Sequence, residues 1–325
     1  MVRASGHAEE ARREGVFMRR PLLGLAAALA LALPCCPRAG AQSSDLFEEL
    51  PRFDGARALE YTRQFVDYAG PRWVGSPGHA RAEQFIKDHF RHDDLVEDTF
   101  VAKTPVGPVP MHNFIVKFPG KKDGIIVVAS HYDTNYPLRN IHYVGANDGG
   151  STTGLLIEMA NYFRGRPDSG YSVWLVFTDG EEAIKSWTDA DSVYGSKHLV
   201  KIWAADGTLK RIRAFLLADM LGDKDLAIDR DMNSTPWLED LVYKAASQYG
   251  WQSFFFQTKM YVGDDHTPFL QRGVPCADLI DFDYGYDNSY WHTAQDTLDK
   301  LGAQSLTISG DTLLETIRLL DEGQR

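Results

Sequence analysis

Cysteine is scarce in this sequence, with three among 325 residues. Cys35 and Cys36 are adjacent near the N-terminus, and Cys276 stands alone in the remainder. A small domain held together by disulfides needs several spaced pairs of cysteines, so that class of fold is excluded. A chain of this length can bury enough apolar surface to fold without such cross-links.

Long apolar runs are also missing. The run Pro21–Leu33 is 13 residues long, whereas a membrane-spanning helix needs roughly 20. It follows Met18-Arg19-Arg20 and precedes the A-x-A cleavage site Ala39-Gly40-Ala41, which predicts a secretory signal. An uncleaved anchor or a disordered leader is the alternative. We therefore expect a leader over residues 1–41 and a mature domain over 42–325, secreted or periplasmic, without stable membrane insertion.

Basic residues are in the minority. Lysine and arginine number 34 against 45 aspartates and glutamates, which gives a net charge of −11 at pH 7. A nucleic-acid-binding domain presents a basic face that neutralises phosphates. The charge balance therefore argues against a nucleic-acid partner.

Apolar runs and turn residues alternate in the order typical of an open α/β sheet. Strands are predicted over Asn113–Phe118, Gly124–Ser130, Ser172–Thr178, Ala214–Ala218 and Pro275–Ile280. Helices are predicted within residues 53–90, with breaks at Gly70-Pro71 and Gly75–Gly78, and over Gly149–Phe163, Trp237–Gln248 and Leu306–Leu320. No linker rich in glycine or proline marks a boundary, which favours a single domain.

Acidic and histidine side chains gather where the predicted strands end or the next helix begins. These residues are His131, Asp133, Asp148, Asp179, Glu181, Glu182, Asp219, Asp264, Asp265, His266 and His292. Ligands of open α/β sheets bind beyond the carboxyl ends of the strands. The pattern therefore predicts a functional site at that edge.

Each of these residues has a purely structural interpretation when it is taken alone. Asp148 is placed to cap a helix, His131 fits a hydrogen-bonded core histidine, and Glu181-Glu182 fits an exposed acidic turn. We expect Asp265 and His266 to cap and orient the helix that follows them. Catalytic zinc sites use carboxylate oxygens and imidazole nitrogens and keep a position open, so the clustering favours a metal site.

Five segments, in this order, resemble those of the zinc aminopeptidase-like family that includes the glutaminyl-peptide cyclotransferases. They are His131-Tyr132-Asp133, Gly145–Asp148, Asp179–Glu182, Asp264–Leu270 and Trp291-His292. The resemblance extends from about residue 75 to the C-terminus. It implies a zinc-exopeptidase-like (phosphorylase/hydrolase-like) α/β fold, with a central mixed sheet and helices on both faces.

The resemblance also implies a role for individual residues. The implied zinc ligands are Asp148, Glu182 and His292, the implied catalytic residues are Glu181, Asp219 and Asp264, and the implied pocket residues are Trp187, Trp291 and Val262. Among the catalytic residues, Glu181 is expected to shuttle the proton, and the two aspartates to support it.

Two branches of the family remain open. Aminopeptidases usually have two metals and a short Glu-Glu-x-Gly-Leu-x-Gly-Ser turn, whereas here Ala183–Trp187 lengthens the segment after Glu182, as in the cyclotransferases. This favours one zinc ion and cyclisation of N-terminal glutamine on peptides or proteins to pyroglutamate, with release of ammonia. The alternative is a di-zinc aminopeptidase, in which His131 and Asp219 hold a second ion with Asp148 as the bridge. A binding module without activity is disfavoured, because every motif residue is present.

The sequence departs from the animal members of this family at three places. Residues 281–290 form a longer loop rich in tyrosine and aspartate, Ser130 stands at a position of the animal disulfide, and Asp278 replaces a family histidine. We expect these differences to alter the shape of the pocket more than its chemistry.

Overall fold

The computed structural model describes residues 50–324. The predicted leader, its cleavage site, Cys35 and Cys36 lie outside these residues. Within the described part of the chain, no helix is long and apolar enough to cross a membrane. Cys276 is buried and forms no disulfide there.

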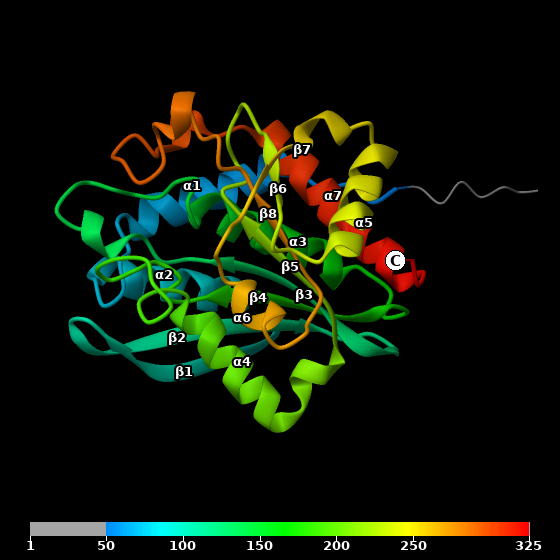
Figure 1. Cartoon of the computed structure of the whole chain (residues 1–325), viewed down its shortest axis with the longest axis horizontal. Helices are drawn as coiled ribbons and strands as arrows, with labels where there is room; N and C mark the ends of the chain where they lie inside the picture. Colours follow the sequence, from blue (N-terminus) through cyan, green and yellow to red (C-terminus); the bar gives the residue numbers. More distant parts are fainter. Residues whose placement is uncertain (1–49, 325) are drawn as a thin grey trace, which may run out of the picture. The chain divides into compact units, whose positions relative to one another are not determined.

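The described chain begins with two helices and three strands, after which helices and strands largely alternate (Figure 1). The helices are α1 (Gly55–Ala69), α2 (Pro77–Phe90), α3 (Gly150–Arg164), α4 (Tyr194–Asp206), α5 (Pro236–Gln248), α6 (Thr267–Leu270) and α7 (Ala303–Asp321). The strands are β1 (Asp94–Thr104), β2 (Gly107–Phe118), β3 (Lys122–His131), β4 (Tyr171–Thr178), β5 (Ile212–Asp219), β6 (Ile228–Asp231), β7 (Phe255–Met260) and β8 (Cys276–Ile280). Each predicted strand and helix core falls within one of these elements.

Among residues 50–324, six strands form one mixed sheet in the order β1-β2-β4-β3-β5-β8. β3, β4, β5 and β8 are parallel to one another, whereas β1 and β2 are antiparallel to their neighbours. In the register of the central strands, Val127 lies between Trp174 and Phe215. β6 and β7 pair separately as a short parallel ladder. The predicted mixed α/β architecture is therefore confirmed.

Helices cover both faces of the sheet, because successive side chains of a strand point to opposite faces. Ile126 and Val128 of β3 belong to a buried cluster with residues of α1, α2, α3, α5 and α7. Ile125 and Val127 belong to a second cluster with residues of α4 and α6. The central strand is thus buried on both sides, as its continuous apolar sequence predicts.

Most of the elements that the sequence analysis missed are partly exposed, although β6 was missed too and is mostly buried. β1 and the first half of β2 form an antiparallel ribbon whose side chains are mostly exposed or half-buried. Charged residues interrupt its apolar pattern, so no buried-strand signal arises. α4 begins after Val193, which has φ 43° and provides no side-chain cap. The sequence therefore contains no capping residue that would predict the start of this helix.

The start of α6 differs from its prediction. The helix begins at Thr267 and has four residues, and neither Asp265 nor His266 caps it with a side chain. The carboxylate of Asp265 instead accepts hydrogen bonds from the hydroxyls of Thr178 and Ser196. The predicted capping role is therefore wrong, because this aspartate joins the end of β4 to α4.

Candidate active site

Three segments that are distant in sequence meet at the carboxyl edge of the sheet. His292 Nε2 lies 3.3 Å from Asp148 Oδ2 and 3.2 Å from Glu182 Oε1. Asp148 does not cap α3, whose N-cap is Gly149, so its carboxylate is available to the site. His292 has φ 54°, in the left-handed region that few residues other than glycine adopt. The structure thus brings together the three residues predicted as zinc ligands.

A second group of donors shares Asp148. His131 Nε2 lies 3.0 Å from Asp148 Oδ1 and 3.2 Å from Asp219 Oδ1. The two oxygens of Asp148 therefore face different histidines. In each group, one donor atom per residue lies within 4.8 Å of the others. The pair of positions required by the two-metal alternative is consequently present as well.

The carboxylates make both positions strongly negative. Burial alone would lower the pKa of His292, but Glu182 and Asp148 outweigh this effect and raise its pKa to about 11. Burial also acts against protonation of His131, yet neighbouring aspartates, with Asp133 the largest contributor, raise its pKa well above the usual value. Buried charges are tolerated where they are paired or bind a metal. The site therefore favours a bound cation.

The donor atoms fit zinc, which binds carboxylate oxygen and imidazole nitrogen and keeps a position open in catalytic sites. Asn135 Nδ2 donates to Glu182 Oε2 at 2.7 Å. The other oxygen, Glu182 Oε1, is buried and has no hydrogen-bond partner among the described residues. It faces His292, so it is placed as a metal ligand would be. His131 Nδ1 is another buried atom without such a partner in residues 50–324.

Two residues that the sequence analysis missed hold the backbone of the Asp148 loop. Arg72 is fully buried, and its guanidinium donates to main-chain carbonyls around the site, including that of Asp148 at 2.9 Å. Asp296 accepts hydrogen bonds from the amides of Asn147 and Asp148 at 2.7 and 3.2 Å. The position of Asp296, four residues after His292, is a signal that could have found it. Arg72 carries no comparable signal in a single sequence.

Glu181 lies beside the candidate metal ligands. Its amide donates to Asp133 Oδ1 at 3.1 Å, and its Oε2 lies 3.9 Å from His131 Nδ1. Burial and the nearby carboxylate of Asp264 raise the pKa of Glu181 well above its usual value. Burial and the carboxylate of Asp219 do the same to Asp264. Such acids can hold and pass protons near neutral pH.

A cavity of about 500 Å³ is lined by five of these acids, Asp148, Glu181, Glu182, Asp219 and Asp264. The three residues predicted to line a pocket, Trp187, Val262 and Trp291, line it too. The indole of Trp291 stacks on the imidazole of His292, with ring centroids 4.1 Å apart. Trp187 is 47% exposed, and Tyr261, which was not predicted, is 76% exposed. The lining of the cavity therefore combines a group of acidic residues with a group of aromatic ones.

A single aspartate organises the loop that carries Trp187. Asp191 accepts hydrogen bonds from the amides of residues 184–186 at 2.9 to 3.0 Å and from the Tyr194 hydroxyl at 2.7 Å. Burial would raise the pKa of Asp191, but these hydrogen bonds outweigh burial and lower it. The sequence analysis missed Asp191, although the polar run 188–192 is typical of a turn.

The three departures from the animal enzymes lie around the site. Ser130 is fully buried. Asp278 is also fully buried, with Oδ2 3.6 Å from His266 Nδ1. In the tyrosine-rich loop, the Tyr284 hydroxyl donates to Asp296 at 2.8 Å. This loop therefore contacts one of the groups that support the candidate metal ligands.

Known proteins resemble this chain over most of its length. Residues 113–317 match peptidase family M28. The chain is 29% identical over 296 residues to the glutaminyl-peptide cyclotransferase of Drosophila melanogaster, with 80% of each chain covered. A crystal structure of a glutaminyl cyclase from an Acidobacteriales bacterium has a TM-score of 0.84 and 56% identity, over 87% of this chain and 100% of the other. A Zn-dependent exopeptidase from Parabacteroides distasonis shares the fold, with a TM-score of 0.73 and 22% identity, over 83% and 99% of the two chains.

Proposed function

This chain belongs to peptidase family M28, and on that premise we propose that it is a zinc-dependent glutaminyl cyclase, an acyltransferase. Its substrates are peptides or proteins with an N-terminal glutamine, and its products are the pyroglutamyl peptide and ammonia. The similarity to glutaminyl cyclases at up to 56% identity supports cyclisation over hydrolysis, because the similarity to the exopeptidase extends to the fold alone.

The observation that carries this proposal is a cavity whose lining combines acidic residues with aromatic and apolar side chains. Cyclisation is intramolecular, so an enzyme gains by holding the glutamine side chain folded back on its own amine. Trp187, Val262 and Trp291 provide apolar walls for the folded side chain. Glu181 lines the same cavity, where its carboxylate can reach the reacting nitrogen atoms.

The reaction needs one proton to move. The α-amine nitrogen bonds to the side-chain amide carbon, the bond from that carbon to the amide nitrogen breaks, and ammonia leaves. Glu181 takes one proton from the attacking amine and returns it to the departing nitrogen, a role that contributes roughly 10²–10⁴-fold. Asp148, Glu182 and His292 would hold the zinc ion, which when bound would supply Lewis-acid polarisation of the amide carbonyl.

Asp264 and Asp219 act around Glu181. Burial and Asp219 keep the pKa of Asp264 high, so its carboxyl group retains a proton and can donate a hydrogen bond within the cavity. The Asp219 carboxylate contacts His131: its Oδ1 lies 3.2 Å from His131 Nε2 and can accept a hydrogen bond from it. Together they hold protons close to the reacting groups.

The rival function is that of a di-zinc aminopeptidase. The observation in its favour is the second donor group, in which His131 and Asp219 flank Asp148. With two ions, Glu181 would activate a water molecule to hydrolyse the first peptide bond. The number of zinc ions therefore separates the two functions.

The deciding experiment gives the purified protein a glutaminyl-peptide amide and a leucyl-peptide amide. We expect ammonia from the first without release of any free amino acid, together with about one zinc per chain. Prolonged dialysis against a chelator should abolish ammonia release, and added zinc should restore it. Release of free leucine, with about two zinc ions per chain, would support the aminopeptidase instead.

We further propose that residues 1–41 direct export, which leaves a secreted or periplasmic catalytic domain over 42–325. The supporting pattern is the arginine pair, the apolar run and the A-x-A site of the leader. Expression of the full chain followed by N-terminal sequencing of the exported protein tests this. A first residue at Gln42, free or cyclised, is expected. Retention of Met1 or Met18 would contradict it.

A further inference from the structure

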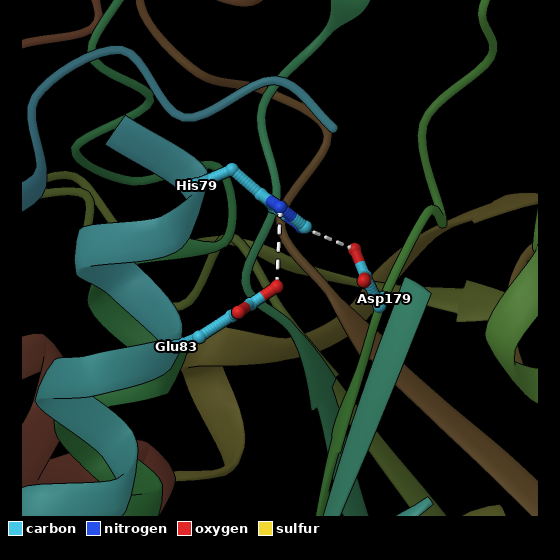
Figure 2. Close-up of side chains that lie close together, drawn as sticks. All are labelled: His79, Glu83 and Asp179. Atoms are coloured by element: carbon cyan, nitrogen blue, oxygen red, sulfur yellow. Dashed lines mark hydrogen bonds and ion pairs between the residues drawn. The ribbon is translucent and has the colours of Figure 1, made fainter. Parts of the chain in front are cut away.

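A buried cluster outside the cavity connects α2 to the strand exit that leads to Glu181. His79 Nε2 lies 2.7 Å from Asp179 Oδ1, and His79 Nδ1 lies 3.3 Å from Glu83 Oε1 (Figure 2). His79 is 3% exposed and Asp179 is fully buried. None of the three lines the cavity, and the proposed reaction does not use them.

The geometry favours a bridging imidazole over a metal ligand. The two carboxylates approach opposite nitrogens of the His79 ring: Nε2 forms a hydrogen bond with Asp179, and Nδ1 forms an ion pair with Glu83 when the ring is protonated. The Gly75 amide points at Nδ1 from 3.4 Å, a long hydrogen bond that only the neutral ring can accept and that therefore competes with the ion pair to Glu83. The ring stacks on Tyr132, with centroids 5.5 Å apart and planes 16° from parallel. The imidazole is therefore held on its face and at both nitrogens.

Asp179 connects His79 to the segment that carries Glu181 and makes further hydrogen bonds there. Its other oxygen, Oδ2, accepts the His112 amide at 2.7 Å, and its own amide donates to Asn113 Oδ1 at 3.0 Å. Its carbonyl accepts the Gly195 amide at 2.9 Å. Asp179 thus joins α2, β2 and α4 at the end of β4. The candidate general base is only two residues further along the chain.

Charge explains why a histidine suits this position. An isolated carboxylate in the interior is costly unless a cation or several hydrogen bonds compensate it. Burial alone would lower the pKa of His79, but Asp179, Glu83 and Asp133 outweigh burial and raise it to about 9. Burial raises the pKa of Glu83, and His79 and His112 act against this effect. The neighbouring carboxylates therefore favour the charged form of the ring.

We propose that His79 is a positioning residue, whose charged imidazole bridges Glu83 and Asp179 and thereby fixes the segment that carries Glu181 and Glu182. This inference rests on the proposed function for its kinetic meaning. His79 does not touch the substrate in this account. It sets the turnover rate through the orientation of the proton shuttle, and it leaves the aromatic wall of the cavity unchanged.

The kinetic test compares His79→Gln with the matched control His89→Gln. His89 lies on the same helix, where its Nδ1 contacts the Phe85 carbonyl at 2.9 Å, and it does not contact the β4 exit. We expect kcat to fall at least tenfold in the first variant, with KM changed less than threefold, and both constants to stay within twofold in the control. Equal effects in the two variants, or a loss confined to KM, would overturn the proposal.

A second variant covers the case in which His79→Gln does not fold. Glu83→Gln keeps the imidazole and an acceptor oxygen but removes one negative charge. We expect kcat to fall about threefold and the pKa of His79, followed by NMR of the labelled imidazole, to drop by about one unit from the wild-type value. Unchanged kcat in a folded Glu83→Gln protein would contradict the proposal.

The NMR titration also separates this inference from the proposed function, because it requires no turnover. A wild-type His79 that titrates above pH 8 supports the charged bridge, and one that titrates near 6.5 refutes it. If the wild-type enzyme does not cyclise glutamine, the kinetic comparison is made with the N-terminal substrate that it does convert. Failure of cyclisation and failure of the bridge are then distinct results.

Discussion

The acidic residues of the cavity lining are shielded from solvent, whereas two of its aromatic residues are partly open. Asp148 and Glu182 are 4% and 2% exposed, but Trp187 and Tyr261 are 47% and 76% exposed. Glu182 lies just after β4 and Asp219 ends β5, two strands paired in the central sheet, and Asp148 directly precedes α3. Trp187 and Tyr261 lie on loops. A site that binds a metal and moves protons needs fixed distances, which strand ends provide. Recognition of varied peptides tolerates a more adaptable surface.

The largest effect is expected from a substitution among the acidic residues of the cavity. Glu181→Gln keeps the size of the side chain but cannot take up a proton, so kcat for ammonia release should fall about 10²–10⁴-fold. Zinc content should stay the same, because the three candidate ligands are untouched. The control is Glu322→Gln at the exposed end of α7, which should behave like the wild type. Retention of a tenth or more of the wild-type kcat would exclude Glu181 as the proton shuttle.

A smaller effect on catalysis is expected from a substitution among the aromatic residues of the cavity. Trp187→Ala removes an apolar wall that is half open to water, so kcat/KM should fall about tenfold, mainly through KM. Trp187→Phe should recover most of the loss, because an aromatic surface remains. Steady-state kinetics with a glutaminyl dipeptide amide measure both. A change confined to kcat would mean that Trp187 acts in the chemical step, and it would then not differ in role from the acidic residues of the cavity.

A substitution of Asp191 tests whether the loop that carries Trp187 is held in place by the charge of this aspartate. Asp191→Asn weakens acceptance of three amide hydrogen bonds, so hydrogen exchange at residues 184–186 should become about tenfold faster at pH 7. The folded-state pKa of Asp191 lies below its usual value of 3.8. Its stabilising effect is therefore complete above that value and is lost as the pH falls through the lower folded pKa. The difference between variant and wild type should narrow at such acidic pH, and a constant difference would contradict this assignment.

The smallest effects compare two tyrosines of one loop. Tyr284→Phe removes the hydrogen bond to Asp296 and should lower the free energy of unfolding by about 1 kcal/mol. Tyr286, at 93% exposure, should tolerate alanine within about 0.5 kcal/mol. Urea denaturation of both variants checks this. Equal destabilisation by the two substitutions would mean that the buried Tyr284 contributes no more to stability than the exposed Tyr286.

Much of the fold followed from apolar periodicity alone. β3, β4 and β5 are buried on both faces, so their sequences are continuous apolar runs that leave little choice of element. β1 escaped prediction because its side chains are mixed and partly exposed. Asp265 was misjudged because its position before a proline-containing helix resembles a cap, whereas its hydrogen-bond partners come from β4 and α4, far away in sequence.

The candidate site was predictable in its residue types but less so in its supports. Glu181, Glu182 and His292 lie in recognisable motifs, and the structure brings all three to one cavity. Arg72 was not predictable, because its function depends on carbonyl groups that converge only after folding. His79 gave no signal for the same reason, since its partner Asp179 is 100 residues away.

The sequence by itself determined which segments are buried strands and which acids and histidines follow them, because burial and strand ends leave local patterns. Only the tertiary structure decided that Asp148 faces two histidines, that Asp296 holds its loop and that His79 lies against Asp179. Those relations are set by the order of the strands in the sheet and by the packing of α2 against it. Such long-range pairings have no local signature, since each partner looks like an ordinary polar residue in its own segment.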